Sequence, residues 1–179
     1  ITVNEEKMSK SLGNFFMVID ILEHYDPETL RFFIVSTHYR SPLDFSDARL
    51  TEAQKSLARL RQAQETLGEL QQMLNAGPTE ESMALRAKAQ EIRDAFMEAM
   101  RDDFNTALAI SHMFALAKEI NIYFKSITDA NIKPDGKLVA ILSDVFAEMC
   151  SIIGVLEKTA APEEVADNGD NKEAALVEM

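Results

Sequence analysis

The stretch SDARLTEAQKSLARLRQAQETLGELQQML, residues 46–74, decides the fold, because its apolar residues return at the spacing of an α-helix. They recur at steps of three, four or multiples of these, which places them on one face of a helix. The stripe comprises Leu50, Ala53, Leu57, Leu60, Gln64, Leu67 and Leu74. We predict a long amphipathic helix whose stripe is packed in a helical core.

Helical patterns continue on both sides of this stretch. Asp26-Pro27 is a typical helix start, while Thr79 and Asn105 are candidate caps of two later helices. Residues 133–136 are expected to form a loop before a last helix. The residues expected to face inward are Leu30, Phe33, Ile34 and Thr37, then Leu85, Ile92, Phe96 and Met100, then Leu108, Phe114, Leu116, Ile120, Phe124 and Ile127, and finally Leu138, Ile141, Leu142, Val145, Met149, Ile152, Ile153 and Leu156.

The predicted fold class is therefore all-α. We expect a short loop and helical connecting module in residues 1–45, an antiparallel helical bundle in residues 46–158, and an acidic, disordered tail in residues 159–179. The first three residues, Ile1 to Val3, have β-forming side chains and are interpreted as the end of a strand whose partner is missing.

Composition excludes several function classes. The formal net charge of −12 argues against general nucleic-acid binding, which needs a basic surface. No apolar run reaches the length of a membrane span, and no signal-peptide pattern is present, so we expect a cytoplasmic protein without a membrane partner. The lone cysteine, Cys150, is expected to be a core thiol rather than a metal ligand.

Near the N-terminus, residues 7–11 read Lys-Met-Ser-Lys-Ser, a dense set of hydrogen-bond donors. Two ammonium groups and two hydroxyl groups in five residues can bind phosphate oxygens, and Gly13 lets the backbone pass close to a ligand. By composition alone, a solvated surface turn is the commoner interpretation of such a stretch.

The stretch KMSKSLGNF, residues 7–15, matches the KMSKS signature of class I aminoacyl-tRNA synthetases. YDPETLRFFIVSTHYRSPLDFS, residues 25–46, resembles the segment that follows this signature in cysteinyl-tRNA synthetases. MRDDFNTALAI, residues 100–110, resembles the start of a helix in their DALR-type, anticodon-side bundle. The resemblance covers roughly residues 1–156. A related ligase, which joins cysteine to an amino-sugar inositol, shares the signature and is the nearest alternative.

The resemblance implies an ATP-dependent ligase, with magnesium, that activates cysteine as an adenylate and transfers it to tRNA(Cys). By position, Lys10 would contact the ATP phosphates and stabilise charge on the departing pyrophosphate. Lys7 would assist as a second catalytic residue, and Ser9 and Ser11 would position the loop. Arg40 is a candidate tRNA contact, although bracing of its own loop is the favoured role.

Other parts of such an enzyme are absent from the sequence. The HIGH-type signature and the zinc ligands that select cysteine are not found, so no metal site is predicted in this chain. We expect a C-terminal fragment of the ligase that is monomeric and inactive alone. A free-standing helical binding module, with the lysine loop as an anion contact, is an alternative from another class.

Overall fold

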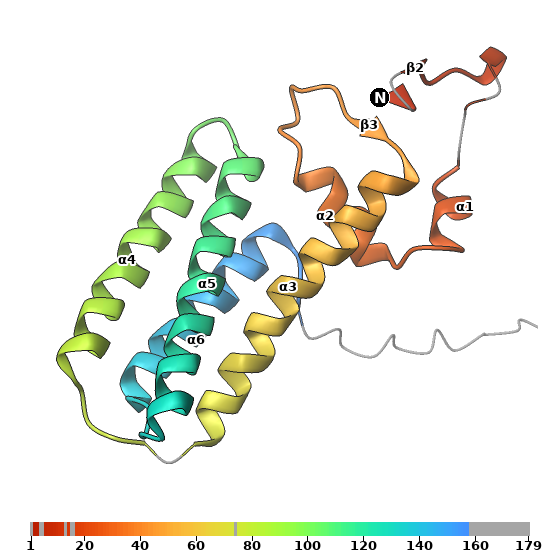
Figure 1. Cartoon of the computed structure of the whole chain (residues 1–179). Helices are drawn as coiled ribbons and strands as arrows, with labels where there is room; N and C mark the ends of the chain where they lie inside the picture. Colours follow the sequence, from red (N-terminus) through yellow and green to blue (C-terminus); the bar gives the residue numbers. More distant parts are fainter. Residues whose placement is uncertain (1, 4–5, 13, 15–16, 74, 158–179) are drawn as a thin grey trace, which may run out of the picture.

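The computed structural model describes residues 2–3, 6–12, 14, 17–73 and 75–157. Four long helices form an antiparallel bundle in which each helix follows the last through a short joint (Figure 1). They are α3 (Asp47–Gln72), α4 (Glu80–Arg101), α5 (Thr106–Ala130) and α6 (Gly136–Ile153). This arrangement confirms the predicted helical fold class.

The apolar residues of the predicted stripe between Leu50 and Leu67 lie in the core, whereas Gln64, which the stripe included, is exposed. Leu50 and Leu60 are fully buried, and they are joined by Ala63 and Leu70, which the stripe had left out. Leu74 lies outside the described residues. Phe96 of α4 is also fully buried, at the centre of the same cluster. Burial of this cluster is the main stabilising term of the bundle.

Three of the expected inward residues are wrong. Ile34, Leu108 and Ile152 are each more than 40% exposed, at 49%, 44% and 42%. All three lie on helices whose apolar residues are not confined to one face, so the helical spacing of apolar residues did not show where the buried face ends. Phe32, two residues before Ile34 on α2 (Pro27–Val35), is buried instead, at 2% exposed.

Hydrogen-bonded caps fix where the helices begin. The side chains of Ser46, Thr79 and Asn105 accept hydrogen bonds from backbone amides in the first turns of α3, α4 and α5. The caps at Thr79 and Asn105 confirm the prediction. They satisfy amide groups that the helix itself leaves unpaired.

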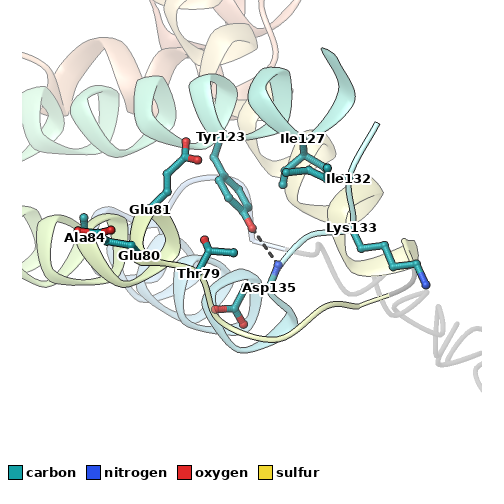
Figure 2. Close-up of a pocket in the computed structure, with 9 residues that line it drawn as sticks. All are labelled: Thr79, Glu80, Glu81, Ala84, Tyr123, Ile127, Ile132, Lys133 and Asp135. Carbon is teal, nitrogen blue, oxygen red and sulfur yellow. Dashed lines mark hydrogen bonds between the residues drawn. The ribbon is translucent and has the colours of Figure 1, made fainter. Parts of the chain in front are cut away.

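Asp135, which was expected to lie in a loop, is the buried N-cap of α6 (Figure 2). Its carboxylate accepts hydrogen bonds from the hydroxyl of Ser82 at 2.8 Å and from the amides of Lys137 and Leu138. The hydroxyl of Tyr123 accepts a hydrogen bond from the Asp135 amide at 2.9 Å. One residue thereby joins α4, α5 and α6 at one end of the bundle.

A small N-terminal module stands at the other end of α6. It contains β1 (Thr2–Val3), β2 (Glu6–Lys7), α1 (Val18–Leu22), α2 (Pro27–Val35) and β3 (Asp44–Phe45). The sheet order is β2-β1-β3, antiparallel between β1 and β2 and parallel between β1 and β3. The domain boundary proposed at residues 45 and 46 falls between β3 and the cap of α3 and stays a prediction.

The expectation that the first strand lacks a partner is wrong. Thr2 pairs with Lys7 on one side and Asp44 on the other, and its hydroxyl donates a 2.7 Å hydrogen bond to the Asp44 carboxylate. The partner strand lies about 40 residues away and has only two residues. Such a short strand has no periodicity by which the sequence could reveal it.

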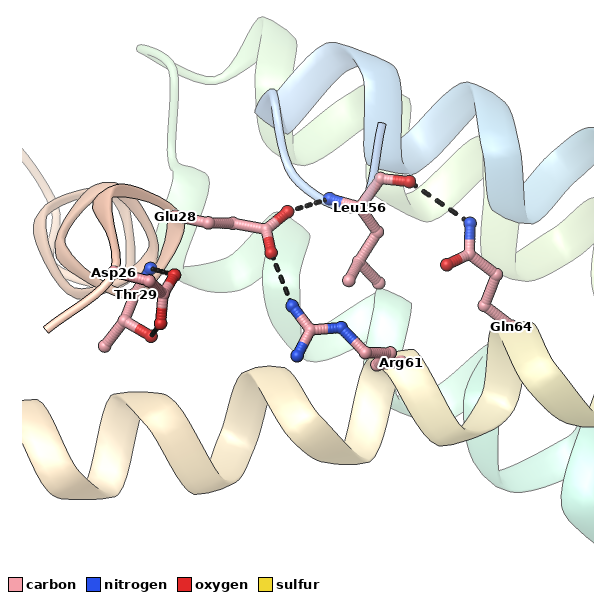
Figure 3. A network of polar contacts seen from close by, with 6 residues as sticks. All are labelled: Asp26, Glu28, Thr29, Arg61, Gln64 and Leu156. Atoms are coloured by element: carbon pink, nitrogen blue, oxygen red, sulfur yellow. Dashed lines mark hydrogen bonds and ion pairs between the residues drawn. The ribbon is translucent and has the colours of Figure 1, made fainter. Parts of the chain in front are cut away.

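Polar contacts attach α2 to the bundle (Figure 3). Glu28 of α2 forms an ion pair with Arg61 of α3 at 2.6 Å and accepts a hydrogen bond from the backbone amide of Leu156. The side-chain amide of Gln64 donates to the carbonyl of Leu156 at 3.1 Å. Leu156 has a φ of +55°, which lies in the left-handed region of backbone conformations. The contacts with Glu28 and Gln64 hold this residue in that conformation beside α2.

The predicted tail in residues 159–179 lies outside the described residues. Among the described helices, none combines the length and apolar character that crossing a membrane requires.

Candidate functional site

The lysine-serine loop is carried by the small sheet. Lys7 ends β2, and Lys10 opens a short 3-10 helix, η1 (Lys10–Leu12). Because β1 pairs with both β2 and β3, and β3 is followed directly by Ser46, the loop is attached to the N-terminal end of α3. The sheet thereby joins the loop to the bundle, although they are far apart along the chain.

Lys7 and Lys10 both have exposed side chains, whereas Met8 and Ser9 between them are partly buried. An exposed pair of ammonium groups on one loop attracts phosphate oxygens, which are strong hydrogen-bond acceptors. The structure therefore places the two lysines that the sequence selected on one loop, with both side chains exposed. Their function as phosphate contacts stays a prediction.

The two serines of the loop bond to each other. Their hydroxyl oxygens lie 2.7 Å apart, and the Ser11 amide donates to the Ser9 hydroxyl at 3.3 Å. These contacts shape the turn between Lys7 and Ser11. They suit the expected role of Ser9 and Ser11 in positioning the loop, with the hydroxyl groups engaged inside it.

The side chain of Asn14 closes the loop, a contact that the sequence analysis did not assign. Its Oδ1 accepts a hydrogen bond from the Ser9 amide at 2.8 Å, and its Nδ2 donates to the Lys7 carbonyl at 3.1 Å. A signal was present, since Asn residues often bond to nearby backbone in turns. Which backbone groups it would meet depended on the folded loop.

Arg40, the candidate tRNA contact, lies in a different loop, between α2 and β3. Its guanidinium forms an ion pair with Asp103 at 2.9 Å and donates to the hydroxyl of Tyr39, which donates in turn to Asp103 at 2.6 Å. The pair joins this loop to the turn between α4 and α5. This is the geometry expected of a bracing arginine.

The turn that Arg40 braces has an unusual backbone. Asp103 and Phe104 have φ values of +55° and +52°, a conformation that costs non-glycine residues about 1 kcal/mol or more each. Bonds from Tyr39 and Arg40 to Asp103 help to stabilise it. The hydrogen bond to Asp103 is also the largest cause that raises the pKa of Tyr39 above its ordinary value.

No group of three or more metal-binding side chains comes together among the described residues. Cys150 is 3% exposed and lies in the core, as the sequence predicted. Burial, with a smaller contribution from the charge of Glu28, raises the pKa of its thiol to about 12. A thiol that resists ionisation in this way is a poor zinc ligand, because zinc binds the thiolate.

Comparisons with known proteins agree with this arrangement. The family described as "tRNA synthetases class I (C) catalytic domain" matches residues 1–55, and the DALR domain family matches residues 95–157. The first match contains the lysine loop and the sheet, and the second contains all of α5 and α6.

Individual relatives are similar along most or all of the chain. A cysteine–tRNA ligase of Desulfitobacterium hafniense is 42% identical over 100% of this chain and 36% of its own length. One of Pelotomaculum thermopropionicum is 41% identical over 99% of this chain and 37% of its own, and one of Moorella thermoacetica is 47% identical over 72% and 28%. The chain thus spans about a third of the length of the curated relatives it matches.

Proposed function

The chain is homologous to cysteine–tRNA ligases along its whole length, and we propose that it forms the part of such a ligase that carries the signature lysines and a tRNA-facing bundle. The observation that carries the proposal is the exposed lysine pair, Lys7 and Lys10, on a loop attached by a sheet to the bundle. Because the chain spans about a third of its relatives, the activity belongs to the whole ligase.

In the proposed reaction, a carboxylate oxygen of cysteine attacks the α-phosphate of ATP. The bond to the bridging oxygen breaks, and its electron pair leaves on pyrophosphate. Lys10, with Lys7 beside it, stabilises the negative charge that grows on this leaving group. Both lysines have exposed side chains with flexible stems, so their ammonium groups can tighten onto the phosphates as the charge develops. A hydroxyl oxygen at the 3′ end of tRNA(Cys) then attacks the carbonyl carbon of the adenylate, and AMP leaves.

Magnesium accompanies ATP in this proposal, and zinc belongs to another part of the ligase. The described residues do not fit zinc, since they contain no metal-binding group and Cys150 is buried. When magnesium is bound with ATP, it neutralises phosphate charge alongside the lysines. This chain's own contribution is the pair of ammonium groups on the loop.

The bundle is proposed to face tRNA, in agreement with the DALR domain match. Arg40 is a candidate contact for the tRNA backbone, but its guanidinium is already paired with Asp103. The net charge of −12 further disfavours a strong contact. We expect the isolated chain to be a monomer that binds tRNA weakly and in a salt-sensitive manner. We also propose that the ligase acts in the cytoplasm.

The proposal is tested by cysteine-dependent ATP–pyrophosphate exchange. The isolated chain should show none, and the complete ligase that contains this sequence should show it. In that ligase, Lys10→Ala should slow activation about 10²–10³-fold with little change in cysteine affinity. Lys118→Ala, an exposed lysine change in α5, is the matched control. Unchanged activation in Lys10→Ala would contradict the role of the loop.

The acceptor of the cysteinyl group is tested separately. The names of the relatives favour tRNA over an amino-sugar inositol. A ligase that activates cysteine and charges tRNA(Cys) supports the proposal. One that activates cysteine but charges only the amino sugar would support the related thiol-biosynthesis ligase.

A further inference from the structure

The side-chain amide of Asn14 contacts two backbone groups of the lysine loop in opposite senses. It accepts from the Ser9 amide at 2.8 Å and donates to the Lys7 carbonyl at 3.1 Å. Residues 7 and 9 are two apart, so in an extended strand these groups point to the same side. The carboxamide of Asn14 therefore bridges the end of β2 and the loop beyond it, with the donor and acceptor of a neighbouring peptide group.

This contact extends the pairing of a very short strand. β2 is paired through Glu6 and Lys7 to β1, which leaves the other side of the strand to Asn14. Near neutral pH, where carboxyl groups are ionised, a carboxamide is the side-chain group that presents an acceptor and a donor on the same carbon. Aspartate keeps the acceptor but cannot donate to the carbonyl, and alanine keeps neither.

The bonds continue toward the second lysine. Asn14 holds the amide of Ser9, whose hydroxyl bonds to the hydroxyl and amide of Ser11 on the far side of Lys10. The backbone on both sides of Lys10 is therefore tied to a single network. Lys7 is tied to the same network through its carbonyl.

We propose that Asn14 is a positioning residue, which sets the spacing and direction of Lys7 and Lys10 toward the phosphates of a nucleotide. The inference rests on the function proposed for the loop. It adds that the loop is partly preorganised by its own side chain before the nucleotide binds. A displacement of about 1 Å at such a site can slow a reaction about 10²-fold, so the orienting bonds carry an effect on rate.

The first test follows the Ser9 amide in this chain by hydrogen exchange with NMR detection. In Asn14→Ala, the protection of the Ser9 amide from exchange should fall about five-fold, because its hydrogen-bond acceptor is removed. This is the effect expected for the loss of one hydrogen bond. Asn14→Asp should keep the protection, since its oxygen still accepts. Asn131→Asp, at the far end of α5, is the matched charge control. Equal protection in Asn14→Ala and in the parent chain would overturn the proposal.

The second test measures cysteine activation in the complete ligase that contains this sequence. Asn14→Ala and Asn14→Asp should each lower kcat about 10- to 100-fold, with little change in the KM for cysteine. In a Lys10→Ala background, either change should have much less effect, because Asn14 acts through that lysine. An undiminished effect in that background would indicate a merely structural role and overturn the proposal.

The two ideas fail in different ways. If Lys10→Ala leaves activation unchanged, the proposed function of the loop fails. If Lys10→Ala slows activation and the Asn14 variants do not, the loop keeps its function and the positioning role of Asn14 fails. Circular dichroism of each variant should remain that of the parent, since Asn14 lies outside the bundle.

Discussion

The helical bundle and the lysine loop are stabilised by different means. The bundle buries a continuous apolar cluster, in which Leu60, Phe96 and Ile120 are fully buried. The loop and the adjoining α1 bury little, and Val18 and Ile19 are 60% and 64% exposed. The loop is instead shaped by hydrogen bonds within a few residues, such as those of Asn14.

The comparison indicates that the stability of the chain and its proposed function depend on different regions. Apolar burial gives the bundle most of its free energy of unfolding, because burial scales with the area removed from water. Exposed hydrogen bonds add little stability, yet they can fix the direction of a functional side chain. Substitutions should therefore affect unfolding in the bundle and ligand geometry in the loop.

The largest effect is expected from Phe96→Ala. Removal of this fully buried ring should lower the free energy of unfolding by about 3–5 kcal/mol, through lost burial and the cavity that remains. Ile19→Ala in α1 is the contrasting change and should stay within about 0.5 kcal/mol, because that side chain is exposed. Urea unfolding of both variants checks the comparison, and similar losses would contradict it.

Asp135→Ala should have the next largest effect and lower the free energy of unfolding by about 2–3 kcal/mol. It removes the cap of α6 and leaves the buried Ser82 hydroxyl without its carboxylate partner. Asp144→Ala, an exposed aspartate of the same helix, is the matched control. The measurement is again urea unfolding. A loss no larger than that of the control would mean that the hydrogen bonds of the Asp135 carboxylate contribute nothing to stability.

Glu28→Ala should lower the free energy of unfolding by about 1 kcal/mol, because Glu28 joins the two regions through a partly exposed ion pair and one backbone hydrogen bond. The change should also raise amide exchange at Leu156 without affecting the centre of α5. Glu69→Ala on the exposed face of α3 is the control. An unchanged Leu156 amide would contradict the attachment described for this network.

The smallest change in the free energy of unfolding is expected when the carboxylate of Asp135 loses its charge in acid. Burial raises the pKa of this carboxyl group, but the hydrogen bonds from Ser82 and from the amides of Lys137 and Leu138 outweigh burial, so its pKa lies below the ordinary value of 3.8. Its ionised form therefore stabilises the fold above about pH 4. That contribution is lost as the pH falls through the lower pKa of the folded state.

Asp135→Asn isolates this contribution, because it removes the titrating group and keeps an acceptor. The difference in unfolding free energy between the parent chain and this variant should be constant near neutral pH and shrink below about pH 4. Urea unfolding at several pH values measures the difference. A difference that grows in acid would contradict the assigned direction of the pKa.

Sequence by itself determined the helices and most of their caps, and it predicted the phosphate-binding role of the loop. The stripe from Leu50 to Leu67 fixed α3, because helical periodicity is local and repeats over many residues. Asp26, Thr79 and Asn105 marked helix starts, because caps bond to amides two or three residues away. Lys7 and Lys10 were selected by the match of residues 7–11 to the KMSKS signature, since composition alone favoured a solvated turn.

Only the tertiary structure decided contacts between residues far apart in the chain. The pairing of Thr2 with Asp44, the ion pair of Arg40 with Asp103, and the burial of Asp135 against Ser82 each join segments about 40 residues or more apart. No local pattern encodes such a partner, since the choice depends on how the helices pack together. The contacts of Asn14 are local but were not predicted: asparagine often bonds to backbone in turns, and only the folded loop shows that its partners are Lys7 and Ser9.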